Sequence, residues 1–201
     1  MLSHWVRHRR GAWYARHLNR WLQPSSRILD VGSGDGYVAH SLRGCGHEVV
    51  CADIWDLHLV GPSPTLYDGR NLPFSSRTFD AAILVTVLHH CAEPWTVVTE
   101  CLRICRGRLF VVEDRYDTRW QRLMTVLTHR LMALGGVMGD EELTFLPTVE
   151  WQRGFQALGL RLAAMEDWGC APPYFPTRAV CLAWEPGEQP TWPVTRGQGK
   201  A

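Results

Sequence analysis

The sequence predicts an α/β domain with a mostly parallel seven-stranded sheet, helices on both faces and an antiparallel last strand. Three observations predict this class. Short apolar runs alternate with amphipathic segments between residues 27 and 113, a cluster of glycines follows the first run, and the last two apolar runs have no helix between them. Alternating strands and helices build a parallel sheet that helices cover on both faces, whereas strands joined without a helix pair antiparallel.

The expected strands are short apolar runs bounded by glycine, proline or polar turn residues. The third is the weakest and follows a loop that holds Pro62 and Pro64. The seven expected strands are residues 27–31, 47–53, 65–67, 79–85, 108–113, 160–168 and 178–184.

The expected helices show apolar residues at helical spacing and end at breakers. Pro24 ends the first helix, Pro94 suits the first turn of the third, and Gly159 closes the last. The five expected helices are residues 2–22, 37–42, 94–104, 116–134 and 149–158.

Composition indicates an ordinary globular domain without a general affinity for polyanions. The 201 residues are 46% hydrophobic, and 21 Lys and Arg against 20 Asp and Glu leave a formal charge of +1. A nucleic-acid partner therefore has no support from the chain as a whole. The longest apolar stretch is far short of the roughly 20 residues that a membrane-spanning helix needs.

The seven cysteines favour a reducing, cytoplasmic location and buried thiols that act as small hydrophobes. They form no Cys-x-x-Cys pair, and no secretory signal peptide precedes them. Because the paired-ligand spacings of structural zinc are missing, no metal site is expected.

The stretch Arg27-Ile-Leu-Asp-Val-Gly-Ser-Gly-Asp-Gly36 resembles motif I of the class I S-adenosylmethionine-dependent methyltransferases. The later motifs follow in the order of the small-molecule subgroup called type 11. They are Asp53, the run from Asp68-Gly69 to Leu72-Pro73-Phe74, Phe79-Asp80 and Leu88-His89-His90. The resemblance covers roughly residues 27 to 115. One departure is Arg106-Gly107-Arg108, where the family has a Lys-Pro-Gly-Gly type of turn; the shorter turn leaves the fold intact.

The resemblance implies a Rossmann-like class I methyltransferase fold and S-adenosyl-L-methionine as the cofactor. A dinucleotide-binding fold also places glycines after its first strand. Its fingerprint would require a third glycine at position 37, which is Tyr37 here, and the charge of Asp30 would repel a pyrophosphate.

The cofactor has an amino-acid end, a sulfonium, a ribose and an adenine, and the resemblance supplies a candidate for each. Asp30 is expected to hold the methionine end, Asp53 to accept from the ribose hydroxyls, and Asp68 to accept from the adenine amine. Ile54 is expected to pack on the adenine face, with a core role as the alternative. A turn-capping role remains an alternative for Asp53 and Asp68. The expected cofactor-binding residues are Asp30, Gly32, Ser33, Gly34, Gly36, Asp53, Ile54, Asp68, Gly69, Val85 and Thr86.

Methyl transfer from a sulfonium is an in-line displacement, so positioning of the acceptor can supply most of the catalysis. An acceptor that must lose a proton needs a base. His89 or His90, just after the fourth strand, is the candidate for that role, and a structural histidine is the alternative. Glu113 and Asp114 are expected to face the same crevice, where they either orient substrate or cap the next helix.

A single domain is expected over residues 1–184, with a disordered tail at 185–201. Within it, residues 27–115 form the cofactor-binding core and 116–184 the variable substrate region and final strands. Residues 1–24 carry a helix with five arginines and no acid before Pro24, interpreted as a lid over the crevice. A helix fixed to the sheet and a contact with an anionic membrane surface are the alternatives.

The function expected from these features is methyl transfer to a small organic acceptor. Two alternatives stay open: a macromolecular methyltransferase whose arginine-rich first helix contacts RNA or an anionic membrane surface, and a cofactor-binding module without turnover. The sequence leaves undecided the acceptor, its reacting atom and the oligomeric state.

Overall fold

The computed structural model describes residues 4–115, 118–134, 146–171 and 178–186. They form a seven-stranded sheet of order β3-β2-β1-β4-β5-β7-β6. Neighbouring strands from β3 to β5 pair in parallel, and β7 pairs antiparallel with both β5 and β6. The strands are β1 (Arg27–Val31), β2 (Glu48–Asp53), β3 (Thr65–Leu66), β4 (Ala81–Val85), β5 (Leu109–Arg115), β6 (Leu160–Cys170) and β7 (Arg178–Pro186).

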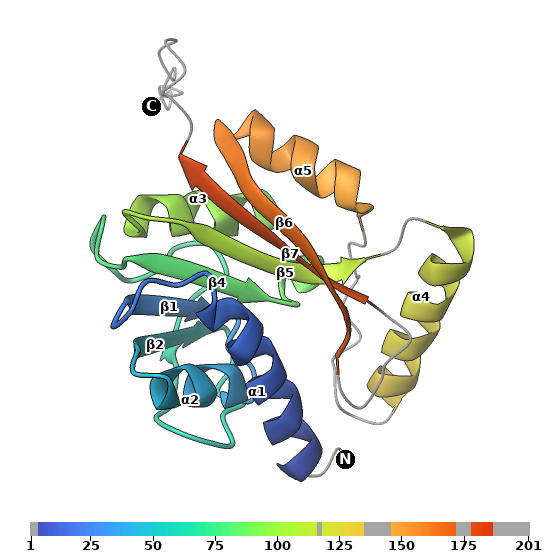
Figure 1. The fold of residues 1–201 in the computed structure, drawn as a ribbon, viewed down its shortest axis with the longest axis horizontal. Helices are drawn as coiled ribbons and strands as arrows, with labels where there is room; N and C mark the ends of the chain where they lie inside the picture. The colour runs from blue at the N-terminus through green and yellow to red at the C-terminus, as the bar shows by residue number, and fades with distance from the viewer. Residues whose placement is uncertain (1–3, 116–117, 135–145, 172–177, 187–201) are drawn as a thin grey trace, which may run out of the picture.

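Helices cover both faces of the sheet (Figure 1). Buried residues of α1 and α2 pack on one face, and those of α3 and α5 pack on the other. The helices are α1 (His4–Asn19), α2 (Tyr37–Gly44), α3 (Pro94–Ile104), α4 (Arg119–Leu134) and α5 (Thr148–Ala157), with a short 3-10 helix η1 (Leu88–His90) after β4.

The alternation of side chains along each strand divides the core into these two halves. In β1, Leu29 and Val31 join the half under α3 and α5, whereas Ile28 joins the half under α1 and α2. All three are fully buried. A strand buried on both faces reads as a continuous apolar run, which is the pattern that predicted β1.

The predicted fold class is confirmed, including the antiparallel last strand, and most element bounds agree to within two residues. The fourth strand begins at Ala81 rather than at 79, because Phe79 makes only an isolated bridge with Cys105. β6 and β7 each extend two residues beyond the predicted end. The predicted tail falls outside the described residues from 187 onward, as do the first residues of the predicted first helix.

Among the described helices, none combines the length and the apolar character needed to cross a bilayer. All seven cysteines are free thiols, four of them buried.

Candidate active site

The candidate site lies at the C-terminal ends of β1, β2, β4 and β5, which run in parallel. Asp30 stands near the end of β1, Asp53 ends β2, and Glu113 and Asp114 stand near the end of β5. Ligands of open α/β sheets bind in the crevice outside these strand ends. The fold therefore gathers acids that are far apart in the sequence at one edge of the sheet.

The loop between β1 and α2 holds its three glycines in left-handed conformations. Gly32, Gly34 and Gly36 have φ values of +68°, +53° and +81°, which side chains of L residues rarely adopt. A Cβ on Gly32 would lie 2.1 Å from Val87 Cγ2, and a Cβ on Gly36 would lie 2.7 Å from the Val60 carbonyl oxygen. A Cβ on Gly34 would meet no atom within 4 Å. Gly34 is thus the glycine that borders open space.

The carboxylate of Asp53 ties the end of β2 to this loop. Its Oδ2 accepts a hydrogen bond from the Gly34 amide at 2.8 Å, and its Oδ1 accepts from the amides of Ile54 at 2.7 Å and Trp55 at 3.3 Å. Asp53 is buried. Because a carboxylate offers about four acceptor positions, these three amides leave capacity for further donors, such as ribose hydroxyls.

Asp30 is buried beneath the loop and has one unsatisfied oxygen. Its Oδ2 has no hydrogen-bond partner among the described residues, and the residue is 2% exposed. Burial, reinforced by the charge of Asp53, raises the pKa of Asp30 to about 8. A buried carboxyl without a partner is costly, and a cationic ligand group nearby would stabilise its ionised form. This chemistry fits the ammonium or sulfonium of the expected cofactor.

Ser33 contacts a residue that the sequence analysis missed. The Ser33 hydroxyl and His58 Nε2 share a hydrogen bond of 2.9 Å, and His58 Nδ1 lies 2.6 Å from the Pro62 carbonyl oxygen. The carbonyl can only accept, so Nδ1 carries the proton, and Nε2 of a neutral ring accepts from Ser33. His58 thereby fixes the loop after β2 against the glycine loop.

Ile54 and Gly69 lie side by side at this end of the site. A Cβ on Gly69 would be 3.5 Å from Ile54 Cγ2, and Gly69 has a φ of +78°. Ile54 is 41% exposed, which is high for a large aliphatic side chain. Its position is compatible with the expected packing on an adenine face.

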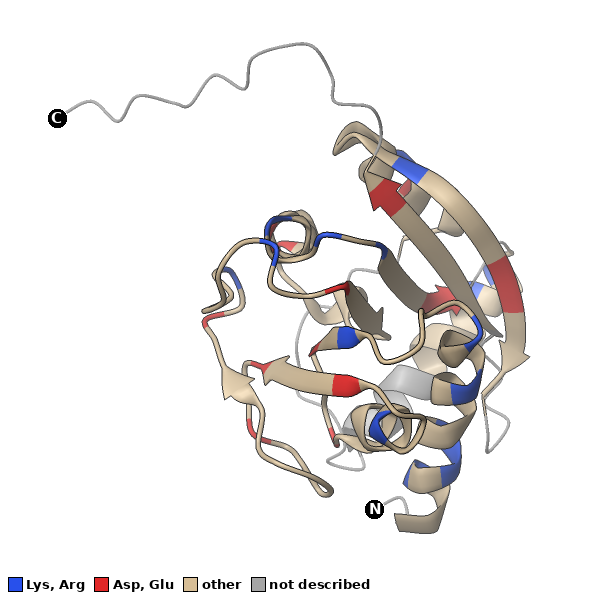
Figure 2. Cartoon of the chain, turned by 60° about the vertical axis from the view of Figure 1, so that its left-hand side comes forward, with Lys and Arg blue, Asp and Glu red and all other residues tan. Residues whose placement is uncertain are grey.

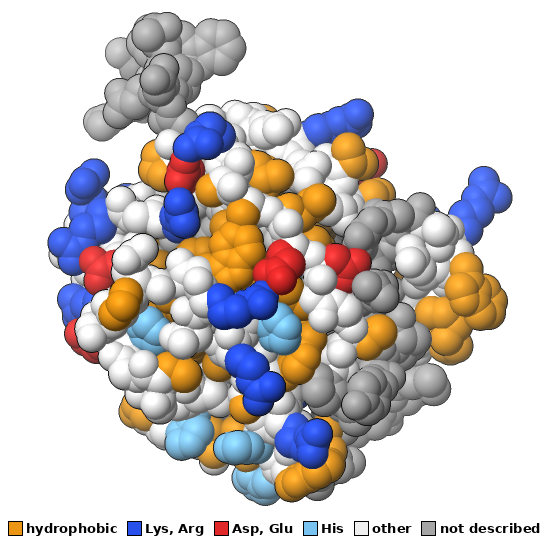
Figure 3. Space-filling view, viewed as in Figure 1, with side chains coloured by type: hydrophobic (Ala, Val, Ile, Leu, Met, Phe, Trp, Pro, Cys, Tyr) orange, Lys and Arg blue, Asp and Glu red, His pale blue; other side chains and the backbone are white. Residues whose placement is uncertain are grey.

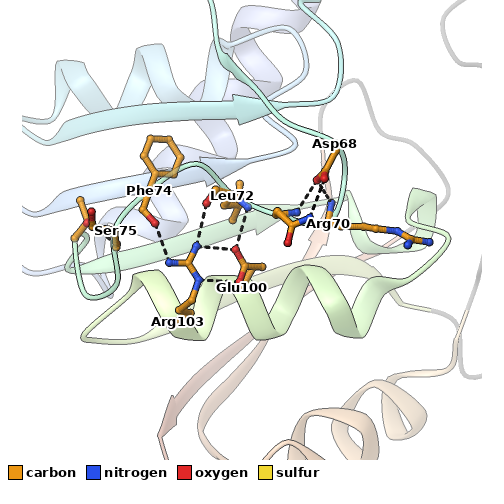
Figure 4. Close-up of polar contacts among 9 residues, drawn as sticks. Asp68, Arg70, Leu72, Phe74, Ser75, Glu100 and Arg103 are labelled. Atoms are coloured by element: carbon orange, nitrogen blue, oxygen red, sulfur yellow. Dashed lines mark hydrogen bonds and ion pairs between the residues drawn. The ribbon is translucent and has the colours of Figure 1, made fainter. Parts of the chain in front are cut away.

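The carboxylate of Asp68 turns into its own loop (Figure 4). Oδ1 accepts from the amides of Arg70 at 2.8 Å and Asn71 at 2.6 Å, and Oδ2 accepts from Asn71 Nδ2 at 2.8 Å. These bonds lower the pKa of Asp68 to about 2. The structure thus displays the turn-capping arrangement, and the adenine contact stays a prediction.

The same loop is anchored on α3 by Arg103 and Glu100 (Figure 4). Arg103 donates to the carbonyl oxygens of Phe74 at 2.8 Å and Leu72 at 2.9 Å, while Glu100 Oε2 accepts from the Leu72 amide at 3.0 Å. Arg103 and Glu100 also pair with each other at 2.7 Å. The loop that carries Asp68 and Gly69 is therefore fixed from below by a helix.

β4 ends in a strained backbone at Thr86. Thr86 has a φ of +55°, and its amide donates to the Val112 carbonyl oxygen at 2.7 Å. Val85 pairs with the same residue of β5 in the strand register. Non-glycine residues in the left-handed region cluster at functional sites, which suits the expected role of Val85 and Thr86 beside the cofactor.

His89 and Glu113 form a buried pair between η1 and β5. His89 Nδ1 lies 2.5 Å from Glu113 Oε2, and both side chains are 2% exposed. Glu113 Oε1 also accepts from the Leu88 amide at 2.9 Å. Burial alone would lower the pKa of His89, but the charge and hydrogen bond of Glu113, aided by Asp114, outweigh it and raise that pKa.

His90 differs from its neighbour in being half-buried, and its ring centroid lies 4.2 Å from that of His89. Of the two candidate bases, His89 is buried against the Glu113 carboxylate and His90 is the more accessible. Among the described residues, no three His, Cys, Asp or Glu side chains are arranged to hold a metal ion.

The N-terminal end of α1 reaches the glycine loop. Arg7 Nη1 donates to Asp35 Oδ2 at 3.0 Å, with both side chains 18% exposed, and His4 Nδ1 shares a hydrogen bond with the Tyr37 hydroxyl. Figure 2 shows basic and no acidic residues along α1. Part of this positive charge is therefore used to hold a residue of the loop itself.

The chain is similar to known proteins in both sequence and fold. Residues 29–111 match the family described as "Methyltransferase domain". An uncharacterized methyltransferase of Mycobacterium tuberculosis is 34% identical over 110 residues, which are 50% of this chain and 42% of the relative. The chain thus spans less than half the length of this curated relative.

Two solved structures share the fold at low sequence identity. A Haloferax volcanii structure, described as a complex between the Trm112 methyltransferase activator and the putative methyltransferase, aligns with a TM-score of 0.70 and 16% identity over 91% of each chain. Magnesium protoporphyrin IX methyltransferase from Synechocystis, solved with bound SAH, aligns with a TM-score of 0.63 and 16% identity over 93% of this chain and 89% of its own.

Proposed function

We propose that the chain, whose residues 29–111 match the methyltransferase-domain family, is a class I S-adenosylmethionine-dependent methyltransferase that transfers the methyl group to a small organic acceptor. The cofactor of this family is S-adenosylmethionine. The observation that carries the proposal is the buried Asp30, whose oxygen lacks a partner among the described residues, beneath a loop where Gly34 borders open space.

The residues present fit the groups of the cofactor. In our proposal the Asp30 carboxylate faces its cationic amino-acid end, Asp53 accepts from the ribose hydroxyls while it keeps the Gly34 amide, and Ile54 packs on the adenine. The walls of the site around the cofactor would be formed by Gly32, Ser33, Gly36, Gly69, Val85 and Thr86.

S-adenosylmethionine, when bound, supplies a methyl group on a positively charged sulfur. Transfer of this methyl group would be an in-line displacement by the acceptor. The protein needs no nucleophile for this displacement; it has to hold the acceptor about 3 to 3.5 Å from the methyl carbon. An acceptor that carries a proton releases it to a base, for which His89 and His90 remain the candidates.

The division of the chain is part of this proposal. Residues 27–115 would hold the cofactor, and residues 116–184 would supply the acceptor side of the crevice, since α4 is the next described element of the chain after β5.

Calorimetric titration with S-adenosylmethionine and S-adenosylhomocysteine tests the proposal before any acceptor is known. We expect both ligands to bind at one site per chain. Gly34→Ala should weaken binding, because its Cβ would fill the open space at the loop. Gly169→Ala is the matched control: Gly169 also has a positive φ, +77°, and no atom within 4 Å of a Cβ, but it lies in β6.

We expect equal backbone strain in the two variants. A lower affinity of Gly34→Ala than of Gly169→Ala for the cofactor would therefore indicate that the cofactor binds at the glycine loop. No heat of binding from either ligand, or an equal loss in both variants, would contradict the cofactor site. Binding without release of S-adenosylhomocysteine, on a panel of acceptors, would instead favour the non-catalytic module.

A further inference from the structure

The described part of α4 exposes an apolar stripe. Trp120, Leu123 and Leu127 are 68%, 55% and 45% exposed. Their spacing of three and four residues places them on one side of the helix. Figure 3 shows hydrophobic side chains at the right-hand edge of the molecule, over α4, with a basic side chain beside them.

The opposite side of α4 faces the protein and is more polar. Thr125 is 1% exposed, and Gln121 and Met124 are half-buried. At 3.6 residues per turn, Thr125 lies across the helix from Leu123 and Leu127. A surface helix of a globular protein ordinarily buries its apolar side, whereas residues 119–127 of α4 turn Trp120, Leu123 and Leu127 outward. An outward apolar stripe of this kind marks an interaction surface.

The charged residues of α4 itself are of one sign. From residue 118 to residue 139 the sequence contains Arg119, Arg122 and Arg130 and no Asp or Glu. Arg119 and Arg122 are exposed, and the helical spacing puts Arg119 beside Leu123. The surface therefore offers tryptophan and leucine side chains bordered by arginine.

This chemistry selects one occupant. We propose that the Trp120-Leu123-Leu127 stripe of α4 docks on an anionic membrane surface, with the leucines among the acyl chains and the arginines at lipid phosphates. Tryptophan is favoured at the level of lipid headgroups, and amphipathic helices with a basic border lie in that plane. Docking against α4 of a second copy would bring arginines together without any acid on the helix to pair with them.

The position of α4 makes such a contact useful. α4 follows β5, at whose C-terminal end Glu113 and Asp114 stand. A membrane bound to α4 would lie near the crevice rather than behind the sheet. The proposal itself concerns binding and does not depend on methyl transfer.

Vesicle co-sedimentation of the full chain tests it. We expect binding to vesicles of phosphatidylcholine mixed with phosphatidylglycerol, little binding to phosphatidylcholine alone, and a loss of binding in high salt. The double variant Trp120→Ser/Leu123→Ser should bind the mixed vesicles at least about tenfold more weakly, because two large apolar side chains leave the interface.

Trp5→Ser is the matched control, because Trp5 of α1 is 64% exposed, beside Arg9, on a helix that is also basic. It should leave vesicle binding unchanged. If Trp5→Ser lost as much binding as the α4 variant, the contact would belong to α1 and the proposal would be overturned. It would be overturned equally by an absence of binding to the mixed vesicles, or by a dimer in vesicle-free solution that Trp120→Ser/Leu123→Ser dissociates. Circular dichroism melting should show that the exposed-site variants remain folded.

Discussion

Nδ1 of His89 lies 2.5 Å from Oε2 of Glu113, and the two side chains are almost completely buried. The pair joins the helical turn after β4 to the end of β5 across 24 residues of sequence. Glu113 also accepts from the Leu88 amide. One carboxylate therefore fixes both the backbone and the imidazole of the Leu88-His89-His90 motif.

Removing Glu113 should destabilise the fold strongly. Glu113→Ala leaves a buried imidazole and a buried amide without their acceptor, and loss of one partner of a buried pair costs about 3 to 5 kcal/mol. Glu93→Ala is the control, since it breaks the exposed Arg70–Glu93 pair, which is worth about 1 kcal/mol at most. Urea unfolding of both variants measures the difference, and similar losses would refute the special role of the buried pair.

The pair should also set the pH dependence of stability. The folded-state pKa of His89 is raised above its usual value, so the pair's contribution is complete below about pH 6.5, the unfolded value, and is lost as pH rises through the folded pKa. Glu113→Gln removes the charge and leaves burial, which lowers the pKa of His89. Stability of this variant should instead fall on acidification. Urea unfolding from about pH 5 to 8 compares the slopes, and parallel slopes would contradict this interpretation.

Asp53→Ala should weaken binding of S-adenosylmethionine at least about tenfold, because charge-assisted hydrogen bonds are worth about 1.5 to 3 kcal/mol each. The Gly34 amide would lose its acceptor as well. Asp56→Ala is the control: Asp56 lies three residues later, in the exposed loop after β2, and accepts from the His58 amide. Calorimetry that finds unchanged affinity for Asp53→Ala, or equal losses in both variants, would remove Asp53 from the site.

The sheet and its order of elements were predictable because each strand is a local apolar run. Ile28, Leu29 and Val31 are fully buried, and their run is bounded by turn residues. Pro94 likewise predicted the start of α3, because proline is favoured in the first turn of a helix. Signals of this kind lie within the element that they predict, which is why the bounds agree so closely.

Contacts between distant loops carried no such signal. The Ser33–His58 hydrogen bond joins two loops whose sequences have no helical or strand periodicity. Glu113 was expected in the crevice, but its pairing with His89 was not. The exposed stripe of α4 was hidden for a different reason, since helical spacing predicts a helix but not which side faces the protein. Tertiary packing settles that choice, and here it turned Thr125 inward.

Binding of the cofactor should release a proton from Asp30. Burial and the charge of Asp53 raise the pKa of Asp30 to about 8, so the carboxyl is largely neutral at pH 7. A cationic ligand stabilises the carboxylate, and affinity should therefore increase as pH rises toward about 8. Titrations in buffers of different ionisation enthalpy measure the proton. Asp30→Asn should remove this release, and identical proton counts for wild type and variant would contradict the assignment.

In the absence of ligand, the same pKa has the opposite effect on folding. The folded state binds the Asp30 proton more tightly than the unfolded chain, so stability should fall as pH rises from about 4 to 8. Asp30→Asn should reduce this slope, which urea unfolding measures without any cofactor.

The last prediction separates a mobile lid from a fixed helix at the N-terminus. Leu18 is fully buried, and Tyr14 and Ala15 are nearly so, in the half of the core shared with α2. A Cβ on Gly11 would lie 2.6 Å from Tyr37 Cβ, so α1 and α2 approach closely. This packing favours a fixed element.

Leu18→Ala should therefore lower the free energy of unfolding by about 2 to 5 kcal/mol, through lost burial and a residual cavity. Trp5→Ala, on the exposed side of the same helix, should change it by no more than about 0.5 kcal/mol. If α1 were instead a lid that opens in the free protein, Leu18→Ala would change the free energy of unfolding little and would raise the Michaelis constant. Arg7→Gln extends the test to the site: if the helix holds the glycine loop through Asp35, cofactor affinity should fall a few fold while the melting temperature changes little.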